Sequence, residues 1–430
     1  MDLLTLNPWW KNGRVPAFFL GRTRRLFNEA LSYLEIRQIL LITGLRRVGK
    51  TTLMHQLIEY LLKQRVSPYQ ILYFSFDELR WEMDALLKEF AFDIYQGDLQ
   101  DKELYVFFDE IQKLPNWDTH IKLLYDQYPR MKIVVSGSAQ ITMWRGSRES
   151  LAGRFFDLRV EPLEFDEYLE FKEIDIDRHR EKIFEGEIRK HFADYLRCGG
   201  FVETLDFNES MLRKYIRESL LERVIFVDMP QSFGINAPEL LFKLLEINAS
   251  LPGLYLDYKN LANDLGADQR TMSNYVVSLE TALLCQKLYN FSSNLLTCEK
   301  KIKRLYLSNT AFTAALEPRV DFALLVEQYF VNRLHGRFFW RDPQKREVDL
   351  ISTKNDVILP IEVKIKKNVD KRDLRGMFQF MERYHLNRGL LITLGKEDVY
   401  EKNGKTITAL PYWRHWTLKR EIQKEPKETS

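Results

Sequence analysis

Short apolar runs alternate with helical patterns over the first 160 residues of the chain. The run from Gln38 to Thr43 is uninterrupted, and a continuous β-prone run needs cover on both faces, so it predicts a buried parallel strand. Apolar residues then recur on one face of a helix between Leu53 and Leu62. Further strands are expected at residues 71–76, 103–108, 131–135 and 155–160.

The turn between the first strand and its helix has the sequence GLRRVGKT. Gly44 and Gly49 allow the backbone to turn tightly enough for its N–H groups to surround a phosphate chain. Lys50 can reach the β and γ phosphates, and the Thr51 hydroxyl can ligate Mg²⁺. The phosphates would lie at the helix N-terminus, where the dipole favours anions. The expected ATP-binding residues are Gly44, Leu45, Arg46, Arg47, Val48, Gly49, Lys50, Thr51 and Thr52. The alternative is a glycine-rich turn that fits the pattern by chance.

Two acidic residues follow the strand expected at residues 103–108. Because α/β sheets bind ligands at the carboxyl ends of their strands, Asp109 is expected to hold Mg²⁺ through water. Glu110 is expected to polarise the attacking water. The alternative is an acidic pair that caps the next helix.

Two further residues are candidates for acting on the transferred phosphate. Ser138 follows the strand at residues 131–135, where a hydroxyl can sense the γ-phosphate; the alternative is an ordinary helix N-cap. Arg154 is a candidate arginine finger, because a fixed guanidinium stabilises charge that develops on the phosphoryl group. The competing arginines are Arg145, Arg148 and Arg159, and a surface arginine is the simpler explanation.

The Trp9-Trp10 pair is interpreted as core packing, with adenine stacking as the alternative.

Three amphipathic helices are expected after residue 237, at residues 239–249, 259–265 and 269–284. Asp268 is placed as the N-cap of the third helix, which gives helix-turn-helix geometry able to present that helix to a major groove. Residues 284–289 and 302–307 are expected to form a two-stranded wing.

The solvent face of the third helix is predicted to carry polar side chains with a single positive charge, namely Gln269, Arg270, Ser273, Asn274 and Ser278. Since phosphate contacts dominate affinity for nucleic acids, this helix alone would bind weakly. The wing is more basic, with Lys300, Lys301, Lys303 and Arg304. Nucleic acid, with DNA expected, is therefore a candidate partner, and a protein-docking module is the alternative.

The tail contains a second candidate site. A helix at residues 324–334 carries Glu327, and neighbouring strands at residues 347–351 and 358–364 carry the rest of the site. Side chains alternate along a strand, so Glu362 and Lys364 share one face. With Asp349 they could hold Mg²⁺, activate a water and neutralise a phosphodiester transition state. An exposed ion pair is the alternative. A basic cluster follows, with Lys366, Lys367, Lys371, Arg372 and Arg375.

Composition narrows the class of protein. The net charge of +3 does not by itself demand a polyanionic partner. The three cysteines, Cys198, Cys285 and Cys298, have no CxxC spacing and support neither a disulfide framework nor a zinc site, so a cytoplasmic location is expected. No run of about 18 apolar residues predicts a membrane span. Disorder is expected after Leu410.

The motifs NPWW, GLRRVGKT, FFDEIQKLPNW, VVSGSA, LAGR and EPLEFDEYL together resemble archaeal and bacterial ATP-binding proteins of the AAA+ class. In that family a P-loop ATPase precedes a winged helix and a restriction-endonuclease-like tail. The resemblance implies an α/β fold with a five-stranded parallel sheet and a helical lid. Glu327, Asp349, Glu362 and Lys364 match the PD-(D/E)xK nuclease core, with Asp349 and Glu362 as metal ligands. The implied domains are residues 1–163, 164–230, 231–310 and 311–415, with a tail at 416–430.

The leading hypothesis is an ATPase, with ATP and Mg²⁺ as cofactors, whose nucleotide cycle controls a DNA-binding and DNA-processing C-terminal region. The alternative is a regulatory ATP switch that binds a protein or nucleic-acid partner and has a catalytically silent nuclease-like domain. AAA+ relatives often act as rings, so an oligomer is compatible with the sequence. A monomer is equally compatible.

Overall fold

The computed structural model describes residues 3–77, 81–100, 102–138, 151–353, 357–370 and 372–424. Two compact units are present, one formed by Met1–Glu167 with Phe201–Glu203 and the other by Tyr168–Gly200 with Thr204–Ser430. Arg145, Arg148 and Lys371 lie outside the described residues.

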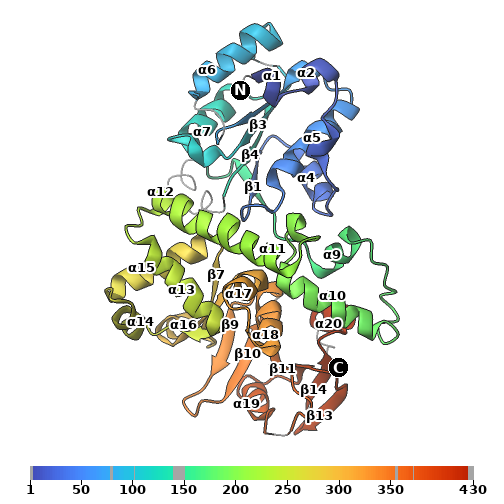
Figure 1. Ribbon diagram of the computed structural model, residues 1–430, viewed down its shortest axis with the longest axis vertical. Helices are drawn as coiled ribbons and strands as arrows, with labels where there is room; N and C mark the ends of the chain where they lie inside the picture. The colour runs from blue at the N-terminus through green and yellow to red at the C-terminus, as the bar shows by residue number, and fades with distance from the viewer. Residues whose placement is uncertain are drawn as a thin grey trace. The chain divides into compact units, whose positions relative to one another are not determined.

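The first unit is built on a five-stranded sheet in the order β2-β3-β4-β1-β5. Every neighbouring pair of strands is parallel, as expected from the sequence resemblance. Figure 1 shows α4 and α5 on one side of this sheet and α6 and α7 on the other. The strands are β1 (Ile39–Thr43), β2 (Ile71–Ser75), β3 (Leu104–Asp109), β4 (Met131–Ser136) and β5 (Phe155–Arg159). The helices are α4 (Phe27–Leu34), α5 (Lys50–Lys63), α6 (Met83–Glu89) and α7 (Trp117–Gln127).

The N-terminal segment covers the edge strand β2. The Asn7 side chain donates to the Tyr73 carbonyl and accepts from the Tyr73 N–H, while the indoles of Trp9 and Trp10 both donate to the Ile71 carbonyl. Trp9 and Trp10 are only 0% and 5% exposed, so their role is core packing and edge protection. This segment contains α1 (Leu3–Leu6), α2 (Trp9–Asn12) and α3 (Ala17–Leu20).

The second unit begins with helices. The region expected to be helical at residues 164–230 contains α9 (Phe165–Phe171), α10 (Glu185–Cys198), α11 (Glu209–Lys214) and α12 (Met229–Phe233), with π-helical segments at Tyr215–Glu222 and Val224–Asp228. The three helices expected after residue 237 are α13 (Pro238–Ser250), α14 (Tyr258–Leu265) and α15 (Gln269–Thr281). Asp268 caps α15 as predicted, because its side chain accepts from the Thr271 N–H.

A nine-stranded sheet runs through the rest of this unit in the order β13-β14-β12-β11-β10-β9-β7-β8-β6. Residues on both sides of the boundary expected at 310 therefore belong to one sheet, joined where β7 pairs in parallel with β9. The strands are β6 (Leu254–Tyr255), β7 (Cys285–Asn290), β8 (Lys303–Leu307), β9 (Phe338–Arg341), β10 (Glu347–Ser352), β11 (Leu359–Lys364), β12 (Arg388–Thr393), β13 (Asp398–Lys402) and β14 (Lys405–Pro411). The accompanying helices are α16 (Leu295–Lys300), α17 (Thr310–Leu316), α18 (Phe322–Arg333), α19 (Arg375–Arg383) and α20 (His415–Gln423).

The expectation of disorder after Leu410 is wrong for the described residues. Helix α20 follows β14, and Trp416 and Leu418 are buried. The buried Glu181 carboxylate accepts from the N–H groups of Trp416 and Thr417, which fixes the start of the helix. The burial of Trp416 and Leu418 thus stabilises this helix despite the charged composition of the segment. Residues 425–430 lie outside the described part of the chain.

All three cysteines are free and buried, in agreement with the expected absence of a disulfide framework. Among the described residues, no helix is long and apolar enough to cross a membrane.

Candidate functional site

The turn after β1 has the backbone geometry expected of a phosphate loop. Gly44 has φ 145° and Gly49 has φ 94°, both positive values that side chains disfavour. A Cβ atom on Gly44 would lie 2.2 Å from the Val160 carbonyl oxygen, so only glycine fits there. The loop leads directly into α5, whose first residue is Lys50. The helix N-terminus is therefore placed to receive an anion.

Lys50 points back into this loop. Its side chain is buried, and Nζ donates to the carbonyls of Gly44 at 3.3 Å and Leu45 at 3.0 Å. The ammonium group therefore lies where the turn would surround a phosphate chain.

Asp109 connects the two predicted nucleotide-binding segments. Its Oδ2 accepts from the Thr51 hydroxyl at 2.6 Å and from the Tyr73 hydroxyl at 3.0 Å. Its Oδ1 accepts from the Ser136 hydroxyl and from the Glu110 N–H. Because β3 lies next to β2 and β4, the carboxyl ends of three strands meet at this carboxylate. A buried aspartate beside a threonine hydroxyl is a set of hard oxygen donors that suits Mg²⁺.

Glu110 and Ser138 lie at the same edge of the sheet. Glu110 follows β3 with a left-handed φ of 51°, and its carboxylate accepts from the Gln112 side chain. Ser138 is half-buried two residues after the end of β4. Ser136, and not Ser138, is the hydroxyl that contacts Asp109. The sensor role of Ser138 stays a prediction.

Arg154 lies at the opposite end of the sheet from the phosphate loop. Its carbonyl accepts from the N–H of Ile39, the first residue of β1, and its guanidinium pairs with Asp126 at 3.2 Å. The five residues of β1 place it roughly 16 Å from the loop at about 3.3 Å per residue. Arg154 is therefore not brought to the phosphate site of its own chain. Arg159 lies at the near end, in register with Thr43.

Several residues that support the site were missed in the sequence. Arg24 donates to the Val48 carbonyl within the loop and pairs with Glu167 at 2.8 Å. Tyr73 and Ser136 hold Asp109. Ser136 lies in the VVSGSA motif, two residues before Ser138, whereas Arg24 and Tyr73 belong to none of the motifs and are identified only by their contacts.

His55 lies on α5, one turn after Thr51, and is 4% exposed. Its ring stacks on Phe19 with centroids 4.6 Å apart and lies 4.8 Å from the Tyr73 ring. Burial lowers the pKa of His55 to about 4, although the nearby Asp109 carboxylate opposes this shift. His55 is therefore neutral in the folded protein at neutral pH.

Acid is expected to destabilise the first unit through His55. The unfolded chain takes up this proton near pH 6.5 and the folded chain only near pH 4, so stability present above pH 6.5 is lost as the pH falls towards 4. The full loss is about 3 kcal/mol, since one pKa unit corresponds to about 1.4 kcal/mol. Urea unfolding between pH 7 and pH 4 should show a shallower pH dependence in His55→Gln, whereas the exposed control His179→Gln should follow the wild type. Equal slopes in all three proteins would contradict the assignment.

The expected nucleic-acid face of α15 is only partly exposed. Gln269, Arg270 and Asn274 are exposed and Ser273 is half-buried. Ser278 is 8% exposed, so its assignment to the solvent face is wrong; it lies on the side of the helix that packs inward. Lys300 is exposed, and Lys301 and Lys303 are half-buried.

Arg304 was expected on the basic wing and is instead buried, with 8% of its surface exposed. Alternation along β8 directs it away from the side occupied by Lys303. Its guanidinium pairs with Glu327 at 2.9 Å and with Asp349 at 3.6 Å. A nucleic-acid contact by Arg304 is therefore excluded in this conformation.

The four tail candidates do converge. Lys364 Nζ lies 2.6 Å from Glu362 and 3.4 Å from Asp349, while Arg304 bridges Asp349 to Glu327. Burial, reinforced by Asp349, raises the pKa of Glu362 to about 8, and the same two causes raise the pKa of Glu327. Over the described residues, no group of three His, Cys, Asp or Glu side chains is arranged to hold a metal ion. The residues present do not fit Mg²⁺, because the Lys364 ammonium lies between Asp349 and Glu362 and the Arg304 guanidinium lies between Asp349 and Glu327.

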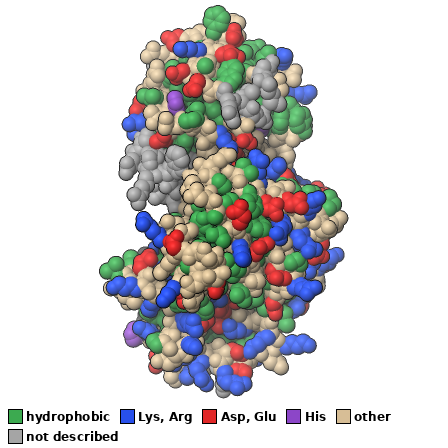
Figure 2. All heavy atoms as spheres, turned by 60° about the vertical axis from the view of Figure 1, so that its left-hand side comes forward, with side chains coloured by type: hydrophobic (Ala, Val, Ile, Leu, Met, Phe, Trp, Pro, Cys, Tyr) green, Lys and Arg blue, Asp and Glu red, His purple; other side chains and the backbone are tan. Residues whose placement is uncertain are grey.

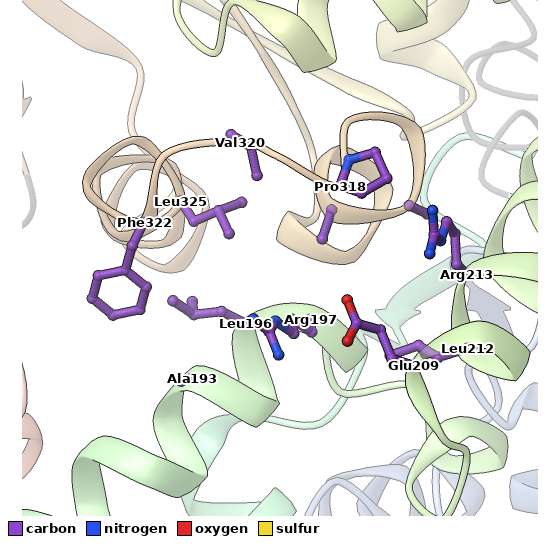
Figure 3. Close-up of a pocket in the computed structure, with 12 residues that line it drawn as sticks. Ala193, Leu196, Arg197, Glu209, Leu212, Arg213, Pro318, Val320, Phe322 and Leu325 are labelled. Carbon is purple, nitrogen blue, oxygen red and sulfur yellow. The ribbon is translucent and has the colours of Figure 1, made fainter.

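A pocket of about 100 Å³ lies elsewhere in the second unit. Figure 3 shows it between helices α10 and α11 on one side and the segment joining α17 to α18 on the other. None of the predicted site residues lines this pocket, which separates it from the chemistry predicted from the sequence.

Three protein-family models match successive parts of this chain. Residues 36–169 match the model of an AAA domain, and residues 189–322 and 320–413 match two domains of unknown function. An uncharacterized protein of Methanocaldococcus jannaschii is 29% identical over 429 residues, covering 89% of this chain and 85% of the relative. An uncharacterized protein of Haemophilus influenzae is 24% identical over 397 residues, covering 90% and 96%.

Solved structures of ATPases are among the similar proteins. The Walker-type ATPase of Pyrococcus abyssi has a TM-score of 0.41 at 14% identity, covering 70% of this chain and 97% of that chain. AMPPCP-bound DnaA from Aquifex aeolicus has a TM-score of 0.32 at 15% identity, covering 64% and 92%. The parallel sheet, the phosphate loop and the Thr51–Asp109 contact agree with the AAA domain match. Residues 36–169 therefore form an AAA-type P-loop ATPase domain.

Proposed function

We propose that this protein hydrolyses ATP and that its nucleotide cycle controls nucleic-acid binding by a winged helix-turn-helix formed by α13–α15 and strands β6–β8. The observation that carries the ATPase part is the 2.6 Å contact between the Thr51 hydroxyl and the Asp109 carboxylate. These two side chains would hold Mg²⁺, which when bound neutralises charge on the β and γ phosphates. Lys50 pairs with the phosphates, and Glu110 orients the attacking water.

The control part rests on Arg47, in the phosphate loop. Its Nη1 lies 3.2 Å from Glu203 Oε1. Glu203 belongs to the segment Phe201–Glu203, which groups with the first unit although the residues on both sides of it belong to the second. Both side chains are about half exposed, so the pair itself adds little stability. A triphosphate in the loop would compete with Glu203 for Arg47 and break this ion pair, which links the nucleotide state to the segment Phe201–Glu203.

The nucleic-acid part rests on the exposed residues of α15. Gln269, Arg270 and Asn274 are accessible on a helix that follows a capped turn, which is the arrangement used for groove contacts. Figure 2 shows Lys and Arg side chains interspersed with Asp and Glu over the face in view, without a single basic surface. We therefore infer weak, salt-sensitive binding. Val277, which is 51% exposed on the same helix, favours the alternative of a protein partner.

The test measures binding of duplex DNA by fluorescence anisotropy with ATP, with ADP and without nucleotide, using full-length protein of known mass in solution. We expect the affinity to change between ATP and ADP, and this change to disappear in Glu203→Gln. Arg270→Ala should lower the slope of binding against salt by about 1. The exposed Arg319→Ala serves as the charge-matched control. Binding that is absent in every nucleotide state, with ATP hydrolysis retained, would favour the protein-docking alternative.

A further inference from the structure

Five charged side chains meet in one buried cluster of the second unit. They come from four elements: Arg304 from β8, Glu327 from α18, Asp349 from β10, and Glu362 with Lys364 from β11. Asp349 is 6% exposed and Glu362 is 4% exposed. Three carboxyl groups therefore share two permanent cations in an environment where unpaired charge is costly.

Arg304 occupies the centre of this cluster. Its Nη2 lies 2.9 Å from Glu327 and its Nη1 lies 3.6 Å from Asp349, while Nε donates to the Gly253 carbonyl at 3.2 Å. The rings of Tyr255, Tyr306 and Phe339 surround the guanidinium at 5.7, 5.2 and 5.8 Å. The Tyr306 hydroxyl also donates to Glu327 at 2.7 Å. The side chain is thus held by hydrogen bonds from Nη2 and Nε and by the three rings, while Nη1 makes no hydrogen bond among the described residues and has only the ion pair with Asp349.

The carboxylate groups of the cluster are already engaged in hydrogen bonds and ion pairs within the protein. Glu327 Oε1 accepts from both Arg304 and Tyr306. Asp349 Oδ2 accepts from the Val363 N–H at 3.0 Å and faces Lys364, and Glu362 Oε2 accepts from the Asp349 N–H. Magnesium requires several oxygen ligands at about 2.0–2.1 Å, and both pairs of carboxylates already hold a cation: Arg304 lies between Glu327 and Asp349, and Lys364 lies between Asp349 and Glu362.

We propose that Arg304 is a built-in cation that takes the place of a metal ion in the tail, so that Glu327, Asp349, Glu362 and Lys364 form a metal-free cluster that does not cleave nucleic acid. Its role is to fasten β8 to the tail part of the nine-stranded sheet. Arg304 lies one residue after Lys303 on the strand that pairs with β7 and β6, whereas its acidic partners lie beyond residue 320. The proposal goes beyond the ATPase function and is independent of it.

The test is a titration of the nucleotide-free, full-length protein with Mn²⁺, followed by the electron paramagnetic resonance signal of free Mn²⁺. The protein carries Asp109→Asn so that the ATP site does not contribute. We expect no bound Mn²⁺ in this background and none in Arg304→Lys, which keeps the positive charge. Arg304→Met should gain one Mn²⁺ site, which the additional change Asp349→Asn should remove. Arg341→Met is the matched control, because Arg341 pairs with Glu347 at 2.8 Å outside the cluster.

Each outcome decides the proposal. Mn²⁺ bound by the protein with Arg304 intact, and lost in Asp349→Asn, would overturn it, and this result does not depend on the folding of Arg304→Met. Folded Arg304→Met that binds no Mn²⁺ would also overturn it. A direct assay adds a second readout: DNA cleavage by the wild type that Glu362→Gln abolishes would contradict a metal-free, silent cluster.

Discussion

Glu110→Gln is expected to lower ATP turnover by about 10² to 10⁴-fold while leaving ATP binding intact, the range found when a general base is lost. Glu110 follows β3 directly and lies next to Asp109, so the amide keeps the shape of the side chain but cannot polarise the attacking water. Steady-state phosphate release and equilibrium binding of ATP measure the two effects separately. Lys50→Ala should differ, because loss of the ammonium in the phosphate loop removes binding as well as hydrolysis.

Glu103→Gln is the matched control for this substitution. Glu103 is exposed immediately before the other end of the same strand, where its carboxylate accepts from the Tyr105 hydroxyl. Turnover should be unchanged in this variant. Hydrolysis by Glu110→Gln at the rate of the wild type would show that another group activates the water.

The ATP site could be predicted from the sequence because its main parts are local. GLRRVGKT specifies a turn between one strand and one helix, and the acidic pair follows a single apolar run. Adjacent carboxyl ends of parallel strands then bring Thr51 to Asp109. Arg24 and Tyr73 could not be assigned, since each is defined by a contact with a distant part of the chain and by no motif of its own. Ser136 lies in the VVSGSA motif, but the motif alone does not say which of its two hydroxyls contacts Asp109.

The cluster in the tail, by contrast, could be predicted only in part, because one of its members is brought in from a distant strand. The convergence of Glu327, Asp349, Glu362 and Lys364 was predicted from strand alternation and a family resemblance. Arg304 was misassigned because a run of four basic residues within five positions reads as an exposed wing. Whether such an arginine points outwards depends on which strand β8 lies beside and what covers it, and neither is encoded within the run. The same limit applies to the helix that contains Trp416 and Leu418, since its start is capped by the distant Glu181.

Asp349→Asn is expected to lower the free energy of unfolding by about 3 to 5 kcal/mol, the cost of removing one partner from a buried ion pair. The amide leaves Arg304 and Lys364 without the carboxylate that both of them contact. Glu362→Gln should not lower stability at pH 7, because the folded carboxyl, whose pKa is raised to about 8, is protonated there and resembles an amide, whereas the unfolded wild-type carboxyl is ionised. The two substitutions make the same carboxyl-to-amide change in the same cluster, so urea unfolding at pH 7 compares them directly.

The pH dependence of the free energy of unfolding in the same two variants distinguishes stabilisation by charge pairing from stabilisation by packing. The Glu362 carboxyl has a folded pKa above its unfolded value of 4.5, so the folded chain binds the extra proton and wild-type stability falls as the pH rises from 4.5 to 8. Glu362→Gln has no proton to lose in either state, so its stability should rise relative to that of the wild type as the pH rises from 4.5 to 8 and level off above that. Asp349→Asn should stay less stable than the wild type at neutral pH, because its loss arises from unpaired cations and not from this titration. Equal losses in both variants at every pH would mean that the cluster acts through shape alone, and that charge balance around Arg304 is not what holds β8 to the tail.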